Sequence, residues 1–243
     1  MTHYDTEQWA AEVIEGRRIF NAGFRMLPDD LPDWEFVKSV PIETSREDSE
    51  LVHMWQRGDG RELLRIQVAE LADWNQALER LREDLQMSMR SDIPRATGAL
   101  GKLGDIAFGA RTPETDVPAA VTFVRGNIFV SVRSVGDRAA DASPVAVWLD
   151  EALSIPPRRG APKGKQGTRR SIEAKPRKAG QEQIIVESVA DATAEGWLKV
   201  LAADGELRRR GDSLIYVSGS AKPTRVELFT RRSGPARGKS RSG

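Results

Sequence analysis

The chain has 243 residues, of which 39% are hydrophobic and 30% are charged. This composition predicts a globular protein with one large or two small domains. No apolar run approaches the roughly 18 residues that a membrane-spanning helix needs. The absence of cysteine excludes disulfides, thiolate metal sites and cysteine nucleophiles.

Charge is spread unevenly along the chain, although the formal net charge is only +1. Residues 1–157 contain 17 Lys+Arg and 27 Asp+Glu, whereas residues 158–243 contain 20 and 9. An acidic body followed by a basic region predicts that the second region tethers the first or contacts a polyanion. Residues 1–9 lack the basic segment and apolar core of a signal peptide. We therefore expect a cytoplasmic protein, or an extracytoplasmic one if the sequence is a mature fragment.

The first half of the chain predicts helices and strands in a clear order. Residues 5–24 have the pattern of an amphipathic helix, which the prolines that follow would end. Asp73 is expected to cap a second helix that runs to Leu85 and buries a stripe of leucines, with Gln76 completing the cap. Between these helices, strands are expected over Trp34–Ile42, Leu51–Gln56 and Leu63–Leu71.

A second passage repeats part of this order. Strands are expected at Ile106–Gly109, Val121–Val124 and Ile128–Val135, followed by a helix over Val145–Leu153. Both passages contain an Arg-Gly turn, a strand and a helix, which suggests an internal repeat of residues 51–90 and 119–154. The alternative is that two copies of a common local order arise by chance. The predicted fold class is α+β, with a mostly antiparallel sheet and helices on one face.

The basic region predicts a linker and a small C-terminal unit. The linker contains nine Lys/Arg, four Gly and almost no apolar side chain, so it cannot offset the entropy of ordering. After it, a small βαβββ unit is expected, with a helix over Ala192–Ala203 and a hairpin around Gly211-Asp212. The predicted divisions are a helical segment 1–26, an α+β domain 27–154, a disordered linker 155–182, the βαβββ unit 183–231 and a disordered tail 232–243.

Catalytic and ligand motifs are weak in this sequence. It has only two histidines, His3 and His53, which argues against a histidine triad or a histidine metal site. Residues 160–166 are one residue short of a phosphate-binding loop. The glycines of residues 98–104 could present backbone N–H groups to a phosphate, but they precede a strand and do not open a helix, so a plain flexible loop is the expectation. Acid pairs at 29–30 and 48–50 are expected to be solvated surface groups. No metal or cofactor is expected.

The remaining candidate site is a set of basic residues that could contact a polyanion through its phosphates. The linker has no aromatic side chain, so such binding would be independent of sequence. The alternative is a solvated segment that pairs with the acidic body. The set is Arg158, Arg159, Lys163, Lys165, Arg169, Arg170, Lys175, Arg177, Lys178, Arg208, Arg209 and Arg210.

Three short segments carry a resemblance. They are Leu103-Gly-Asp-Ile-Ala-Phe108, Phe123-Val-Arg-Gly-Asn127 and the stretch from Pro144 to Asp150. Over residues 27–153 the chain resembles small α/β domains of bacterial sensor proteins and lipoproteins, in which a Gly-Asp-x-Ala-Phe strand and an aromatic-x-Arg-Gly-Asn hairpin precede a closing helix. The resemblance implies a fold and no chemistry, and proteins of that kind are usually exported.

Together these features predict a non-enzymatic binding, scaffolding or assembly module that contacts a protein partner or a second copy of itself. The alternative is a protein that binds nucleic acid or an anionic surface through the basic linker, hairpin and tail. An enzyme is the third hypothesis, since no nucleophile, base or metal-ligand set is recognisable.

Overall fold

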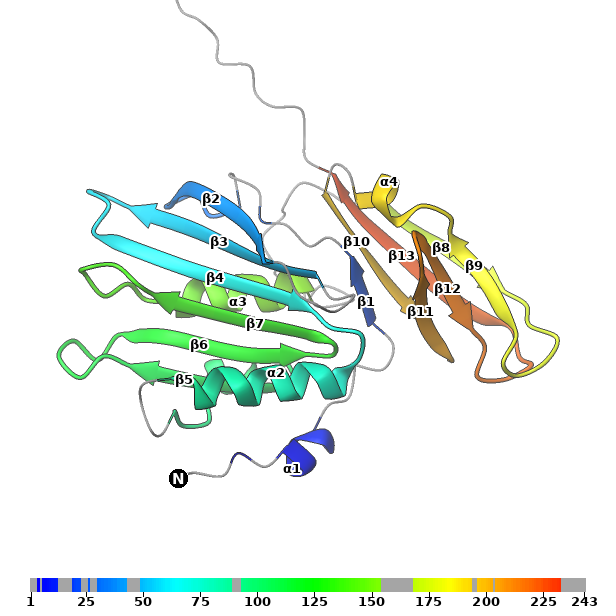
Figure 1. Cartoon of the computed structure of the whole chain (residues 1–243), viewed down its shortest axis with the longest axis horizontal. Coiled ribbons are helices and arrows are strands. Elements are labelled where there is room, and N and C mark those ends of the chain that lie inside the picture. Colours follow the sequence, from blue (N-terminus) through cyan, green and yellow to red (C-terminus); the bar gives the residue numbers. More distant parts are fainter. Residues whose placement is uncertain are drawn as a thin grey trace, which may run out of the picture. The chain divides into compact units, whose positions relative to one another are not determined.

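The computed structural model describes residues 4, 6–12, 19–22, 26, 30–42, 49–88, 93–153, 168–193, 196–202 and 204–232. The chain forms two compact units (Figure 1). The first contains Met1–Asn21 and Pro28–Ala161, and the second contains Ala22–Leu27 and Pro162–Gly243. Each unit is described separately below.

The first unit is built on one antiparallel sheet with the strand order β2-β3-β4-β7-β6-β5. Its helical elements are α1, α2, α3 and the short 3-10 helix η1. This confirms the predicted α+β class with a mostly antiparallel sheet. The elements are α1 (Thr6–Ala10), β2 (Glu35–Ile42), β3 (Ser49–Arg57), β4 (Glu62–Glu70), α2 (Trp74–Gln86), η1 (Leu100–Lys102), β5 (Ile106–Arg111), β6 (Pro118–Arg125), β7 (Ile128–Ser134) and α3 (Ser143–Leu153).

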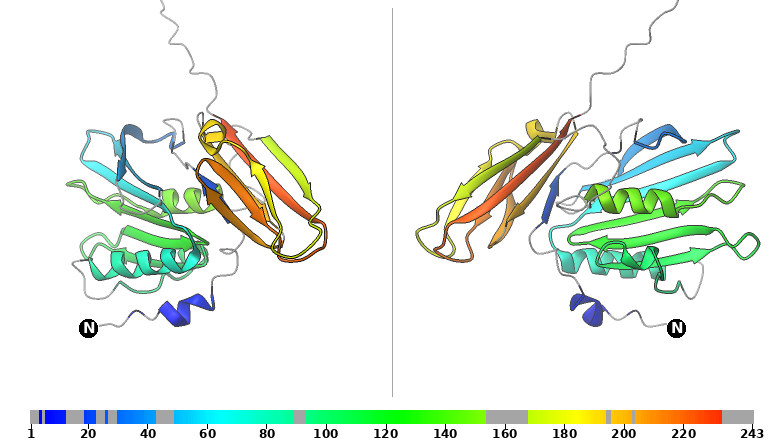
Figure 2. Two further views of the ribbon diagram at one scale, coloured as in Figure 1. Left: turned by 45° about the vertical axis from the view of Figure 1, so that its right-hand side comes forward. Right: turned by 180° about the vertical axis from the view of Figure 1, so that it is seen from behind.

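The two long helices lie on opposite faces of this sheet, and not on one face as predicted. Thr122 and Arg125 are three residues apart on β6, so their side chains point to opposite faces. Thr122 donates to Asp84 of α2, whereas Arg125 donates to Asp150 of α3. In Figure 1, α2 lies in front of the strands and α3 behind them, and the view from behind in Figure 2 brings α3 forward.

The helix α2 is stabilised both by a capping residue at its start and by an apolar stripe that packs on the sheet. Asp73 accepts a hydrogen bond of 2.9 Å from the backbone N–H of Gln76, which confirms the predicted N-cap. Ala77, Leu78, Leu81 and Leu85 recur at helical spacing and are all buried. They pack with Ile106, Phe108, Val124 and Phe129 of the sheet, so α2 closes one core over β5, β6 and β7.

The order of three strands and a helix occurs twice, as β2-β3-β4-α2 and β5-β6-β7-α3. The two sets of strands meet where β4 pairs antiparallel with β7. A two-fold axis normal to the sheet would relate such strands, but it would place both helices on the same face. Because the helices lie on opposite faces, such an axis would not relate α2 to α3, and the internal repeat stays a hypothesis.

The second unit consists mainly of strands, which pair antiparallel in the orders β10-β13-β8 and β11-β12-β9. Buried residues alternate along its strands, as in Leu198, Val200 and Ala202 of β10. The elements are β1 (Ile19–Ala22), where the chain passes between the units, β8 (Thr168–Ala174), β9 (Glu182–Val186), α4 (Val189–Thr193), β10 (Gly196–Ala202), β11 (Glu206–Arg210), β12 (Ser213–Val217) and β13 (Thr224–Arg232).

Three local predictions are wrong. The helix over residues 5–24 does not continue, because α1 ends at Ala10 and Ile19–Ala22 is a strand. The helix over Ala192–Ala203 is replaced by the end of α4 and by β10, whose seven residues pair with β13. Thr168–Ala174, expected in a disordered linker, forms β8 on the other side of β13. Residues 155–167 and 233–243 lie outside the described residues.

The tryptophans of the chain differ in how far they are buried. Trp74 and Trp148 are only half-buried, and the side chain of Trp197 lies outside the described set. Trp55 of β3 is fully buried instead, with Phe36 packed edge-on at a ring-centroid distance of 5.2 Å.

We therefore expect Trp55→Ala to lower the free energy of unfolding by about 3–5 kcal/mol, since it leaves a large cavity in a closed core. Trp74→Ala is the matched control and should cost clearly less, because its site already touches solvent. Equilibrium urea denaturation of both variants measures this. Equal losses would contradict the assignment of Trp55 as the anchor.

A second capping carboxylate lies in the second unit, at the start of α4. The Ser188 hydroxyl donates to Asp212 at 2.6 Å, and the Ala190 N–H donates to the same carboxylate at 2.8 Å. These hydrogen bonds favour the charged form and lower the pKa of Asp212 below its usual value.

Because the pKa of Asp212 is lower in the folded protein than in the unfolded chain, its stabilising contribution is present above the unfolded value near 3.8. That contribution is lost as the pH falls through the folded pKa. Ser188→Ala removes the main cause and should raise the pKa of Asp212, as measured by NMR titration of its carboxyl carbon. An unchanged pKa would show that the hydroxyl does not stabilise the charged form.

Candidate interaction surfaces

A buried ion pair joins α3 to the sheet. Arg125 donates from Nε to Asp150 Oδ1 at 2.7 Å, and its Nη2 lies 2.5 Å from the same oxygen. The two side chains are only 5% and 1% exposed. The backbone N–H of Gly104 donates to the same Asp150 oxygen at 2.8 Å. A carboxylate with these partners is held in place, so the pair fixes α3 against β6 and the segment before β5.

Gly104 has to be glycine for this approach to occur. Its φ is +57°, and a Cβ there would lie 2.2 Å from the carbonyl oxygen of Val124. The neighbouring Asp105 accepts from the Gly126 N–H at 2.8 Å, which ties the same segment to the β6–β7 turn.

Asn127 completes the connection between the two halves of the sheet. Its side-chain amide donates to the Leu71 carbonyl at 3.0 Å, and its own carbonyl accepts from the Leu71 N–H at 3.0 Å. Residues of all three resemblance motifs are thus brought together, and each observed contact is structural. The motifs explain how the first unit is assembled and do not form a reactive site.

A polar cluster lies on the α2 face of the sheet, beside the helix. Arg133 of β7 contacts Asp84 of α2 at 2.6 Å, and Arg80 of α2 contacts Glu50 of β3 at 3.4 Å. Gln67 of β4 donates to Glu50 and accepts from Arg65 Nη1 at 2.7 Å. Glu50 and Asp84 are both buried, and each carboxylate contacts an arginine. A buried carboxylate that is paired in this way does not resemble a free general base.

Arg65 differs from the other arginines of this cluster. It stands directly opposite Arg133 across the β4–β7 pair, an arrangement that like charges disfavour. Arg133 is compensated by Asp84. For Arg65, no carboxylate among the described residues lies within ion-pair distance, and its amide partner Gln67 is neutral. Among the described residues, Arg65 is therefore the cation of this cluster without a carboxylate partner.

The α2 face of the sheet continues beyond Arg65 to β2 at the edge, and its apolar exposure lies on β2, since Val52 of β3 and Gln67 of β4 on the same face are buried. Register places Lys38, Met54 and Arg65 in one row across β2, β3 and β4. In the adjoining rows of β2, Val40 is 43% exposed and Ile42 is 36% exposed. We call this surface, defined by Lys38, Val40, Ile42, Met54 and Arg65, the open face. In Figure 1 no helix lies in front of these strands.

The edge of β2 itself is poorly suited to pairing with another strand. Pro41 has no N–H to donate, and the register shifts between Phe36 and Lys38. Prolines and bulges on an edge strand discourage strand addition. A partner of the first unit is therefore better accommodated on the open face than along this edge.

Other predicted candidates have structural roles. His53 lies within β3 and is fully buried, which confirms a strand position. Asp30 and Glu50 are both buried, so the prediction that they are solvated is wrong for both. Glu50 is enclosed because Gln67 and Arg80 contact its carboxylate. Asp29, Asp48 and residues 160–166 lie outside the described residues.

The glycine-containing loop at 98–104 does not offer a phosphate cradle. The N–H of Gly101 donates to the Thr97 carbonyl and that of Leu103 to the Leu100 carbonyl. Gly104 donates to Asp150, as described above. These backbone groups are thus engaged within the protein. The Arg-Gly-Asp sequences at 57–59 and 210–212 are turns between paired strands, as predicted.

The basic residues that the sequence singled out are scattered in the structure. Arg158, Arg159, Lys163 and Lys165 lie outside the described residues, as does the side chain of Arg169. Arg170 lies on β8, while Lys175, Arg177 and Lys178 lie in the loop before β9. Arg208, Arg209 and Arg210 lie on β11. All of the described ones belong to the second unit.

The β11 arginines are largely compensated. Arg208 contacts Glu206 at 2.7 Å, and this hydrogen bond raises the pKa of Arg208 above its usual value. Arg210 contacts Glu182 of β9 at 2.8 Å. Arg209 donates to the Gly211 carbonyl at 3.1 Å. The hairpin that was most basic by sequence is therefore not the strongest concentration of uncompensated charge.

The open face was missed by the sequence analysis. Its arginine and its apolar residues come from separate strands, and only their register brings them into neighbouring rows. The sequence of β2 indicates only that Lys38, Val40 and Ile42 share one face of the strand, because they occupy alternating positions. That pattern does not distinguish an open face from one covered by a helix.

Comparison of the chain with protein-family models, with curated proteins and with solved structures found no match. The resemblance to sensor and lipoprotein domains stays a prediction. Within the described part of the chain, no group of three or more His, Cys, Asp and Glu side chains could hold a metal ion. No helix in that part is long and apolar enough to cross a membrane.

The buried ion pair generates a test of its structural role. Asp150→Leu leaves the Arg125 charge buried and should lower the free energy of unfolding by about 3–5 kcal/mol. Replacing both partners, in Arg125→Met with Asp150→Leu, should cost less than the two single changes added together. Denaturant unfolding of the four proteins gives this coupling, and simple additivity would show that the two side chains do not act as a pair.

Proposed function

We propose that the chain is a non-enzymatic protein-binding module, and that the open face of the first unit receives the partner. The observation that carries this proposal is the exposure of Val40 and Ile42 near Met54 and Arg65, which has no carboxylate partner among the described residues. Apolar side chains that stay exposed next to a polar rim are typical of interaction sites. The described helices pack elsewhere, because α2 covers β6 and β7 and α3 lies on the opposite face.

The charges of the open face indicate the chemistry of the partner. Lys38 is exposed, and Arg65 can donate several further hydrogen bonds in a fixed geometry. A carboxylate is the protein group that matches a guanidinium best. We therefore propose a partner segment that combines apolar side chains, to cover Val40 and Ile42, with at least one Asp or Glu, to pair with Arg65.

A peptide of alternating Leu and Glu provides a defined probe of this surface. In a titration of the whole ¹⁵N-labelled chain, we expect shifts of the amides of β2 and β3 and of the Arg65 Nε–H. A peptide of alternating Leu and Lys, equally apolar, should leave these signals unchanged, because its charges oppose Lys38 and Arg65.

Two matched variants localise the binding. Ile42→Asp should weaken it about tenfold, because it removes apolar contact and adds a repelling charge. Ile184→Asp makes the same change at a 58% exposed isoleucine of the second unit and should leave the affinity unchanged. Equal effects of both variants would contradict the proposal. A dimer that sedimentation detects and that Ile42→Asp abolishes would also contradict the proposal, because the open face would then bind a second copy of the chain and not a different protein.

A further inference from the structure

Two neighbouring loops of the second unit gather basic side chains. One loop joins β8 to β9 and carries Arg177 and Lys178, and the other joins β12 to β13 and carries Lys222. All three side chains are exposed. We call these three residues the loop cluster.

Hydrogen bonds through Ser218 hold the two loops together. The Ser218 hydroxyl donates to the Lys178 carbonyl at 2.9 Å and accepts from the Gln181 N–H at 3.0 Å. The Gly180 N–H donates to the Ser218 carbonyl at 2.8 Å, with Gly180 at a φ of +76°. Ser218 itself is buried. The backbone that presents the loop cluster is therefore fixed before any ligand arrives, which reduces the entropy lost on binding.

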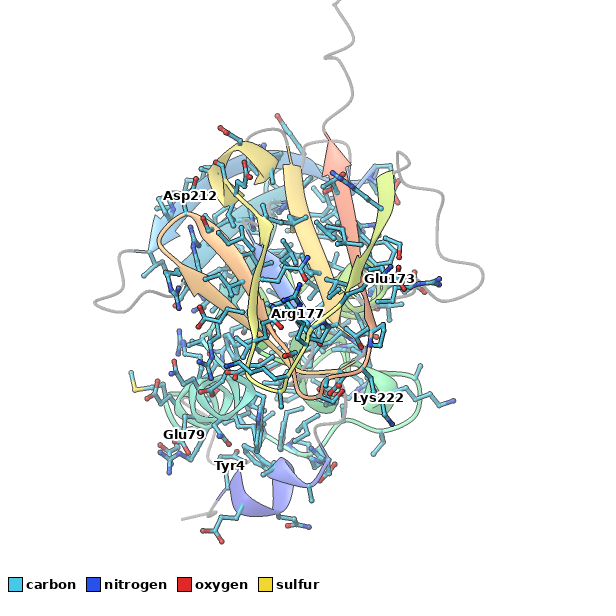
Figure 3. All side chains as sticks on the ribbon, turned by 90° about the vertical axis from the view of Figure 1, so that its right-hand side faces the viewer. Tyr4, Glu79, Glu173, Arg177, Asp212 and Lys222 are labelled. Atoms are coloured by element: carbon cyan, nitrogen blue, oxygen red, sulfur yellow. The ribbon has the colours of Figure 1, made fainter. Side chains whose placement is uncertain are left out.

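The loop cluster is also less compensated than three other basic residues of this unit, Lys175, Arg208 and Arg210. Among the described residues, no carboxylate lies within ion-pair distance of any of its three members, whereas the nearby Lys175 contacts Glu173 at 3.1 Å. The hairpin arginines Arg208 and Arg210 each contact a glutamate. In Figure 3, Arg177 and Lys222 lie away from Asp212, which marks the hairpin turn.

We infer that the loop cluster is a binding site for the phosphate backbone of double-stranded nucleic acid. Exposed cations without counter-charges attract phosphates by releasing condensed counterions. Neither loop, 175–181 or 218–223, contains an aromatic residue, so stacking on unpaired bases is not favoured. The loops also carry no large apolar residue that would insert into a membrane. This function is separate from the proposed binding of a protein on the first unit.

Two variants of the whole chain remove equal charge from different places. The loop variant combines Arg177→Gln, Lys178→Gln and Lys222→Gln, and the hairpin variant combines Arg208→Gln, Arg209→Gln and Arg210→Gln. Fluorescence anisotropy with a labelled DNA duplex, between about 50 and 200 mM salt, measures both affinity and its salt dependence. Circular dichroism and thermal unfolding check that both variants fold.

For the unmodified chain we expect three loop contacts to contribute about −2.7 to the slope of log affinity against log salt, since each phosphate contact contributes about −0.9. Those contacts correspond to a loss of about 40-fold in affinity over this salt range. The loop variant should lose that part of the slope and bind at least about tenfold more weakly at the lower salt. The hairpin variant should keep both the slope and the affinity.

Several results would overturn the inference. Equal losses in the two variants would show that only total charge matters, and no loss in either would place binding elsewhere on the chain. A larger loss in the hairpin variant would assign the contact to β11. Absence of DNA binding at the lower salt would also reject the inference. If vesicles of phosphatidylcholine and phosphatidylserine then bound to the chain, its anionic ligand would be a lipid surface and not nucleic acid.

Discussion

The carboxylate of Asp150 holds the first unit together, because it accepts at one oxygen from both the Arg125 guanidinium and the Gly104 N–H. It lies on α3, whereas its donors lie on β6 and just before β5, so three segments far apart in sequence converge on it. A buried charge of either sign is costly unless it is paired and hydrogen-bonded. This requirement accounts for a glycine with positive φ at Gly104, where any side chain would meet the Val124 carbonyl.

The position of α3 has a consequence on the other side of the sheet. Because α3 is fixed behind β6, only α2 covers the front of the six-stranded sheet among the described long helices, and α2 packs on β6 and β7. On this front, Val40 and Ile42 of the edge strand β2 are left exposed. Arg65 has no carboxylate partner among the residues that the structure describes, because Asp84 pairs with Arg133 and Glu50 with Arg80. The proposed partner site is thus what remains after the core and its ion pairs are complete.

Charge in the second unit shows that a basic sequence and a basic surface are different properties. The three consecutive arginines of β11 are the most conspicuous basic run, yet cross-strand and nearby glutamates compensate two of them. Lys222 is a single lysine between neutral neighbours in the sequence. It joins Arg177 and Lys178 only because Ser218 ties their loops together. An electrostatic surface depends on where the counter-charges fall, and this is set by pairing between strands.

By itself, the sequence determined those features that depend on neighbours a few residues away. These include the Asp73 cap, the glycine turns, and the strands whose alternation is strong, such as β4 and β7. Tertiary structure decided the rest. Trp197, Leu198 and Leu201 have a spacing that suits a helix, but pairing with β13 made the segment a strand and buried its alternate residues. Which face a helix covers, which arginine finds a carboxylate and which side chains share a cross-strand row all depend on contacts between distant segments, and local propensity carries no information about them.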